Sequence, residues 1–150
     1  MGLIPRNLLI SKELSFESKS EIDIPLNTLV ANPLILKTWS IRKIDPLQLD
    51  QITSILDSVY FTEIKRTAGA GTVTLILQYN DDLGNWGDFM NITGVDPAYT
   101  TKYNSGNKTG SWNETTQFRL IAYNTNGTTS GKVQNLKVYF RILLPIGYSL

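Results

Sequence analysis

An alternation of apolar and polar residues dominates the C-terminal end of the chain. Between residues 136 and 144, every second side chain is apolar: Leu136, Val138, Phe140, Ile142 and Leu144. This period of two is typical of a strand with one face in a core. A second apolar run, residues 118–123, precedes it, and the loop between them is rich in Asn, Thr, Gly and Ser, which favour turns. The pattern predicts a long antiparallel pair, with a flexible connection over residues 124–131.

The same alternation predicts further strands upstream. Residues 72–80 alternate clearly, and the turn at 81–85 leads into another predicted strand at 86–92. Residues 21–26, 34–44 and 59–65 also have strand patterns, and the first is expected at an edge because Pro25 cannot donate to a ladder. Residues 94–115 lack apolar periodicity and predict a long polar loop, a kind of segment that is often functional.

One segment has the pattern of a helix. Asp45 is a favoured N-cap residue and Pro46 suits the first helical position. Apolar residues follow at helical spacing: Leu49, Ile52, Leu56 and Val59. We therefore expect one short helix over residues 46–56. The alternative is a loop that leads straight into a strand, since the Thr and Ser residues here are weak helix formers.

Together these elements predict an all-β fold. About eight strands, at most one short helix and turn signals at intervals of roughly 8–12 residues favour an antiparallel two-sheet β-sandwich, jelly-roll-like in its connections. There is no alternation of strands and helices that would indicate a parallel sheet. We expect an N-terminal arm over residues 1–20 and a single domain over residues 21–150.

The arm contains apolar residues outside any sustained pattern: Leu3, Ile4, Leu8, Leu9 and Ile10. One interpretation is a short edge strand followed by a loop. The other is an arm that docks on a neighbouring subunit, because chain ends are usually loose unless something holds them. Both remain open, and these five residues are the candidate subunit interface.

The amino-acid composition excludes several kinds of catalytic and metal site. The chain of 150 residues has no His and no Cys, which excludes Ser-His-Asp and Cys-His triads, His-ligated metals and thiolate sites. A net charge of +1 gives no reason to expect nucleic acid. No apolar run approaches the roughly 20 residues of a membrane helix, and no signal-peptide pattern is present. We expect a non-enzymatic protein with no cofactor and no membrane insertion.

Three acidic residues are weak candidates for a calcium site: Asp81, Asp82 and Asp88. Oxygen-rich loops can hold calcium, but the spacing does not fit an EF-hand. Turn formation explains these residues more simply, so we expect no metal.

Five aromatic residues lie in or beside the predicted loops: Trp86, Tyr99, Tyr103, Trp112 and Tyr123. The first four, with Asn113 beside Trp112, are the candidates for glycan binding. Such rings can stack on sugars because they combine an apolar face with a polar tip. The alternative for Trp86 is a plug at the end of the core. Four Asn-x-Thr sequons, at Asn91, Asn107, Asn113 and Asn126, are attributed to chance in a chain rich in Asn and Thr.

Residues 72–86, a strand followed by an acidic-Gly turn and a Trp, resemble the central hairpin of discoidin-like and carbohydrate-binding-module sandwiches. Residues 118–123 and the long closing strand resemble the end of such domains. The resemblance covers the second half of the chain, and similar domains are found on phage capsid and tail proteins.

Two functions follow. The first is a structural protein of a viral or phage virion (capsid, decoration, spike or tail part), located in the virion, forming a homo-oligomer and contacting other virion proteins. The alternative is a carbohydrate-binding or adhesion module that uses the loop aromatics. The two can coexist, whereas an enzyme would need carboxylate or Ser-Lys chemistry alone.

Overall fold

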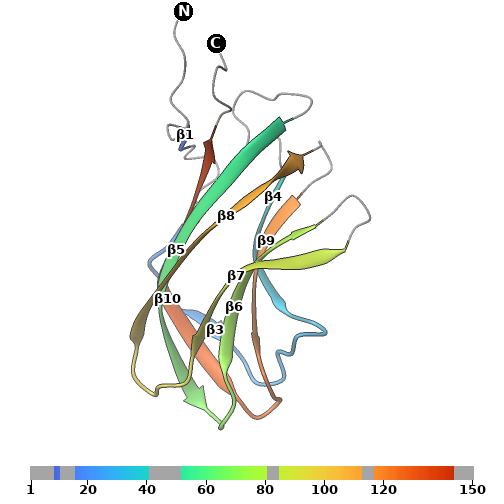
Figure 1. The fold of residues 1–150 in the computed structure, drawn as a ribbon. Coiled ribbons are helices and arrows are strands. Elements are labelled where there is room, and N and C mark those ends of the chain that lie inside the picture. Colours follow the sequence, from blue (N-terminus) through green and yellow to red (C-terminus); the bar gives the residue numbers. More distant parts are fainter. Residues whose placement is uncertain (1–8, 11–15, 41–51, 81–84, 113–116, 144–150) are drawn as a thin grey trace, which may run out of the picture.

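The computed structural model describes residues 9–10, 16–40, 52–80, 85–112 and 117–143, and these form two antiparallel sheets packed face to face (Figure 1). The strands are β1 (Leu9–Ile10), β2 (Phe16–Ser18), β3 (Ile22–Ile24), β4 (Leu34–Ser40), β5 (Ile52–Ala68), β6 (Val73–Asn80), β7 (Trp86–Gly94), β8 (Thr100–Trp112), β9 (Gln117–Asn124) and β10 (Ser130–Leu143). These residues contain no helix, and so none that could cross a membrane. The predicted all-β sandwich is confirmed.

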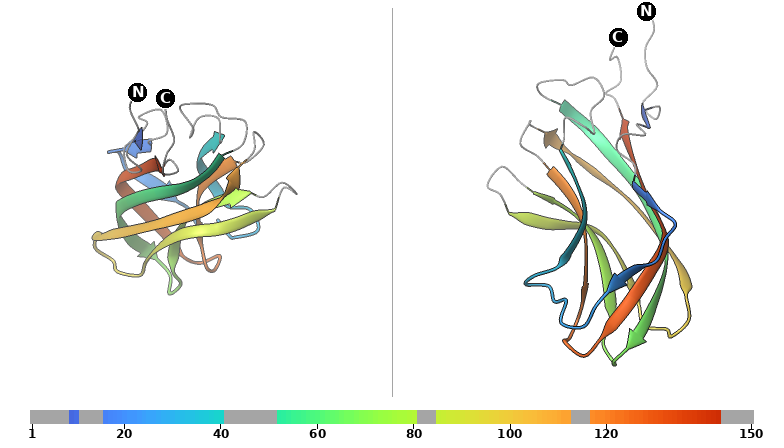
Figure 2. Two further views of the ribbon diagram at one scale, coloured as in Figure 1. Left: turned by 45° about the horizontal axis from the view of Figure 1, so that its top comes forward. Right: turned by 180° about the vertical axis from the view of Figure 1, so that it is seen from behind.

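The two sheets share no strand. One has the order β10-β5-β8, with β1, β2 and β3 pairing one after another along the free edge of β10. In the right-hand view of Figure 2 these N-terminal strands, in blue, follow β10. The other is the four-stranded sheet β4-β9-β6-β7. β7 and β8 lie beside each other at one side of the sandwich, where the Asn104 side chain donates to the Asn91 carbonyl at 2.7 Å.

The core forms where the apolar faces of the two sheets meet. Leu75 and Leu77 on β6 face Val138 and Phe140 on β10, and all four are fully buried. Aromatic rings bridge the layers. Phe140 of the six-stranded sheet lies 5.0 Å from the Trp39 ring and 5.7 Å from the Phe118 ring, both of the four-stranded sheet.

A bulge in β10 changes which positions face the core. Val133 and Leu136 are both fully buried although they are three residues apart, which strict alternation does not allow. The register shifts between Gln134 and Lys137, and Asn135 adopts a positive φ of 51°. Asn tolerates this conformation better than most residues. After the bulge the predicted alternation holds through Phe140.

The prediction that residues 118–123 and 136–144 pair with each other is wrong. β9 pairs with β4 and β6, and β10 pairs with β5, in the opposite sheet. Both strands carry a strong apolar face, and those faces meet across the core instead of lying side by side. The connection over residues 125–129 therefore crosses from one sheet to the other.

Two further predictions need correction. β5 begins at Ile52, so residues 52–56 are not helical, and residues 46–51 lie outside the described part. The β-branched residues Ile52, Thr53 and Ile55 suit a strand that pairs on both sides. Residues 100–112 are not a loop but the edge strand β8, paired with β5 from Thr100 to Trp112. An edge strand needs little apolar content, so the polar sequence of β8 did not indicate a strand.

Candidate functional site

The outward side of the four-stranded sheet is more enclosed than a solvated sheet face. On β6, the residues that alternate with the core positions are also nearly inaccessible: Thr74 is 5%, Ile76 4% and Gln78 9% exposed. Ile76 lies opposite Ile121 of β9, which is 1% exposed, and neither belongs to the core cluster between the sheets. A second, smaller apolar layer therefore supports the polar groups of this side.

A chain of hydrogen bonds crosses three strands on this side. The Arg119 Nε of β9 donates to Gln78 Oε1 of β6 at 2.8 Å, and Gln78 Nε2 donates to Asp88 Oδ1 of β7 at 2.9 Å. Strand pairing places both partners opposite Gln78. Because the Gln78 amide uses its oxygen and its nitrogen at once and is nearly buried, its orientation is fixed.

Trp86 completes the arrangement. It begins β7 opposite Asn80, is half-buried, and its ring lies 4.1 Å from the Arg119 guanidinium carbon. A guanidinium over an indole face is attracted by the negative face of the ring. Arg119 is half-buried, and this burial lowers the pKa of its guanidinium.

Tyr123 of β9 lies on the same side. Burial raises the pKa of its phenol, and the negative charge of Asp88 raises it further. We call this set the Trp86 face; it comprises Gln78, Trp86, Asp88, Arg119 and Tyr123. An aromatic ring beside fixed amide, carboxylate and guanidinium groups can bind a polar ligand that also has an apolar side.

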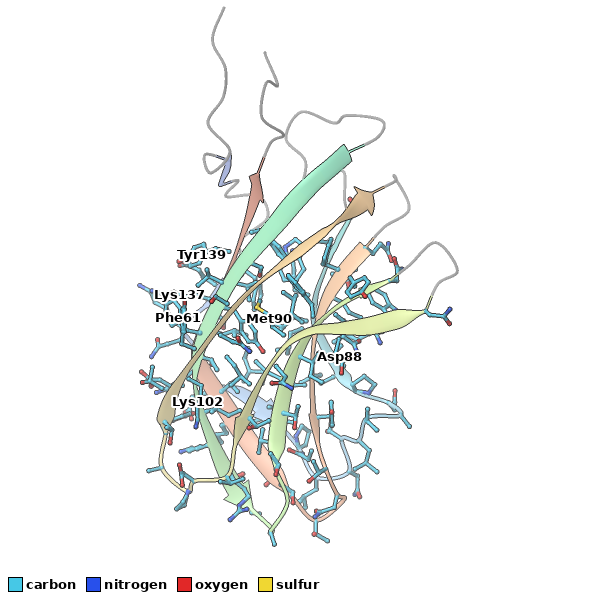
Figure 3. The ribbon with its side chains drawn as sticks, viewed as in Figure 1. Phe61, Asp88, Met90, Lys102, Lys137 and Tyr139 are labelled. Carbon is cyan, nitrogen blue, oxygen red and sulfur yellow. The ribbon has the colours of Figure 1, made fainter. Side chains whose placement is uncertain are left out.

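The other predicted aromatics lie elsewhere. Tyr103 of β8 is 65% exposed and opposite Phe61 of β5, on the outward side of the six-stranded sheet. Lys137 lies 5.1 Å above the Phe61 ring, and Tyr139 donates to Glu17 Oε1 at 2.6 Å. Figure 3 shows Phe61, Lys137 and Tyr139 on one side of the molecule and Asp88 on the opposite side. The structure does not bring Tyr103 and Trp86 together.

Tyr99, in the connection between β7 and β8, contacts Glu21 and Lys65. Its hydroxyl donates to Glu21 Oε2 at 2.6 Å, and Lys65 lies 4.4 Å from its ring centre. Burial and then the bond to Glu21 raise the pKa of Tyr99, while the same bond and the charge of Lys132 lower the pKa of Glu21. Tyr99 thus fixes the β7–β8 connection to the N-terminal side of the sheet.

Several candidates fall wholly or partly outside the described residues. This applies to Leu3, Ile4, Leu8, Asp81, Asp82 and Asn113, and to the side chain of Trp112, whose backbone ends β8. Leu9 and Ile10 form β1 and pair with β10 of the same chain, as in the edge-strand interpretation of the arm. Within the described residues no three His, Cys, Asp or Glu side chains could share a metal ion, and Asp88 instead accepts from Gln78.

Sequence reasoning missed Gln78 and Arg119. Each is the polar position inside an otherwise apolar strand, in Leu77-Gln78-Tyr79 and Phe118-Arg119-Leu120. That signal was available, but it marks any outward position. Only the pairing of β6 with β9 places these two residues opposite each other.

Comparisons with known proteins inform the fold alone. No protein-family model matches the chain, and no curated protein is similar to it in sequence. Among solved structures, the CBM22-1 xylan-binding domain from Paenibacillus barcinonensis Xyn10C is similar with a TM-score of 0.50 and 11% identity, over 91% of this chain and 80% of that one. Eiger TNF from S. frugiperda is similar with a TM-score of 0.45 and 11% identity, over 91% and 96%. The β-sandwich thus resembles that of a carbohydrate-binding module.

Proposed function

We propose that this chain is a non-catalytic domain that binds a glycan on the Trp86 face. The observation that carries the proposal is the hydrogen-bonded row from Arg119 through Gln78 to Asp88, beside a half-buried Trp86. Sugars present hydroxyls around the ring edge and C–H groups on its faces. They are bound well by fixed polar groups next to an aromatic ring, since groups that are already ordered lose little entropy on binding.

Two further observations support this proposal. The fold resembles that of a domain that binds xylan, although at this identity the resemblance concerns architecture only. The absence of His and Cys from the chain leaves few side chains for proton transfer or nucleophilic chemistry at neutral pH. Both observations are consistent with a surface that binds a ligand without reacting with it.

The test is binding by the single-domain protein to a glycan array, followed by calorimetry on the best ligand with two matched variants. Trp86→Ala should weaken binding by about tenfold or more, equivalent to about 1.4 kcal/mol. Tyr103→Ala removes a more exposed aromatic from the opposite side and should change affinity less than about twofold. Absence of any glycan ligand, or a larger loss in Tyr103→Ala than in Trp86→Ala, would contradict the proposal.

A specific observation also favours the second candidate, an assembly protein such as a virion component. Four aliphatic side chains in and beside the β3–β4 connection are exposed: Leu26 52%, Leu29 38%, Val30 64% and Ile35 54%. Exposed apolar groups that follow closely along one segment of the chain often mark contacts between proteins. We propose that a second copy of the chain covers them.

Light scattering coupled to size exclusion tests the assembly role. The wild-type protein should elute as an oligomer, and Val30→Asp should lower its mass by placing a charge in the contact. Thr101→Asp, at an exposed position of β8, is the matched control and should leave the mass unchanged. A wild-type monomer at high concentration, or an unchanged mass in Val30→Asp, would count against this role.

A further inference from the structure

We propose that the Trp86 face selects a sugar that carries a carboxylate, and that Arg119 binds this group with the free end of its guanidinium. The inference rests on the proposed glycan-binding function and names the ligand class of the same face. Uronic acids and sialic acids share this chemistry, a carboxylate on a six-membered sugar ring.

The donors of Arg119 are only partly used. A guanidinium has five N–H groups. Among the described residues, the bond from Nε to Gln78 at 2.8 Å is the hydrogen bond that Arg119 donates. Its terminal nitrogens, which form the planar fork that matches a carboxylate, have no partner in that part of the chain.

The charge of Arg119 also lacks a described counter-ion. No carboxylate of a described residue lies within ion-pair distance of it, whereas Lys132 has two, Asp23 at 3.4 Å and Glu21 at 3.8 Å. Its two contacts among the described residues, the Gln78 amide and the Trp86 ring, are neutral. A half-buried cation that is oriented by neutral groups and left without an anion is favourably placed to receive one from a ligand.

Asp88 limits how much negative charge the ligand can carry. It lies on β7, with β6 between it and β9, and only the Gln78 amide separates its carboxylate from the Arg119 side chain. At this short separation Asp88 repels further negative charge on the ligand, whereas the one carboxylate that Arg119 binds is held by direct contact with the guanidinium. Its own carboxylate can accept from sugar hydroxyls. The face therefore suits one acidic group at the β9 side and hydroxyls toward β7, and not a uniformly charged polyanion.

The experiment compares acidic sugars with their neutral counterparts by calorimetry on the intact chain. The pairs are sialyllactose with lactose, and the monosaccharide galacturonate with galactose; each acidic sugar carries a single carboxylate, and the two pairs distinguish the two sources of that group. In at least one pair the acidic sugar should bind about tenfold tighter. Arg119→Gln should remove this preference, and Arg119→Lys should keep only part of it because an ammonium lacks the fork.

Lys37→Gln is the matched control, since it removes the same charge from an exposed position of the neighbouring strand β4. It should keep the preference within about twofold. An equal loss in Lys37→Gln and Arg119→Gln would overturn the inference in favour of a general field effect. Melting temperatures show whether each variant is folded. If Arg119→Gln does not fold, the loss of preference in Arg119→Lys tests the inference instead.

The two proposals fail in different ways. The carboxylate preference would be overturned, and glycan binding left intact, if neutral sugars bound as tightly as acidic ones and Trp86→Ala still lowered the affinity for both. No binding of any sugar would overturn both.

Discussion

Tyr60 shows how a single polar group links the two sheets. It lies on β5, is fully buried, and its hydroxyl donates to the Leu75 carbonyl of β6 in the opposite sheet at 3.0 Å. Burial raises the pKa of Tyr60 far above its ordinary value of 10.0. Its phenol is therefore a hydrogen-bond donor that the fold keeps protonated, and it contributes to stability only while the proton remains.

This gives a pH dependence with a definite sign. The pKa in the folded state lies above that in the unfolded state, so the contribution is complete below about pH 10 and declines as the pH rises further, since only unfolded Tyr60 then loses its proton. Tyr60→Phe should make the fall in unfolding free energy above about pH 10.5 less steep, by about 1.4 kcal/mol per pH unit.

Urea denaturation at several pH values measures this slope. The raised pKa values of Tyr99, Tyr123 and Tyr139 leave the variant with some alkaline slope of its own. Tyr139→Phe, at a half-buried position, is the control and should flatten the slope less. Identical slopes for Tyr60→Phe and the wild-type protein would refute the role assigned to this phenol.

Among the elements, two connections depend on each other. The turn between β5 and β6 bonds to the connection between β9 and β10: Gly71 N donates to Thr129 Oγ1, and Thr72 N to Thr125 Oγ1, each at 2.8 Å. Gly69 begins this turn with a φ of +79°, and a Cβ there would come within 2.4 Å of the Thr128 carbonyl oxygen. Only glycine fits this position without moving the neighbouring backbone.

Gly69→Ala should therefore lower the unfolding free energy by about 1–3 kcal/mol, because of backbone strain and the steric clash. Chemical denaturation measures the change. Ala70→Ser alters an exposed neighbour in the same turn and should stay within about 0.5 kcal/mol of the wild-type protein. If Gly69→Ala also changed the unfolding free energy by less than about 0.5 kcal/mol, the two connections would be able to move apart without loss of stability.

The accuracy of sequence prediction for each element depended on how much of the element is buried. β6 and its hairpin with β7 were predicted correctly, because Val73, Leu75 and Leu77 mark one buried face and Asp and Gly mark the turn. β8 was missed because it is a polar edge strand that shows little periodicity. The pairing of β9 with β10 was wrong because alternation reveals a buried face but not the partner that covers it.

The residues of the candidate site could likewise be predicted from the sequence only in part, because some of them meet only in the complete fold. Trp86 and Asp88 could be named from the sequence, as an aromatic and a carboxylate near a turn. Gln78 and Arg119, 41 residues apart, become neighbours only through the register of β6 with β9. Tyr103 looked equivalent to Trp86 in the sequence and lies on the other sheet. Register and layer are properties of the complete fold, so local pattern could not provide them.

At the scale of the whole molecule, the outward sides of the two sheets offer two different surfaces. One is the Trp86 face, and the other includes Phe61 on β5 and the exposed Tyr103 on the edge strand β8. The claim that a glycan binds to the first of these surfaces is most directly tested by backbone amide NMR during titration with the best array ligand. Shift changes should concentrate on β6, β7 and β9 around Gln78, Asp88 and Arg119. Changes concentrated on β5, β8 and β10, or none at a saturating ligand concentration, would contradict it.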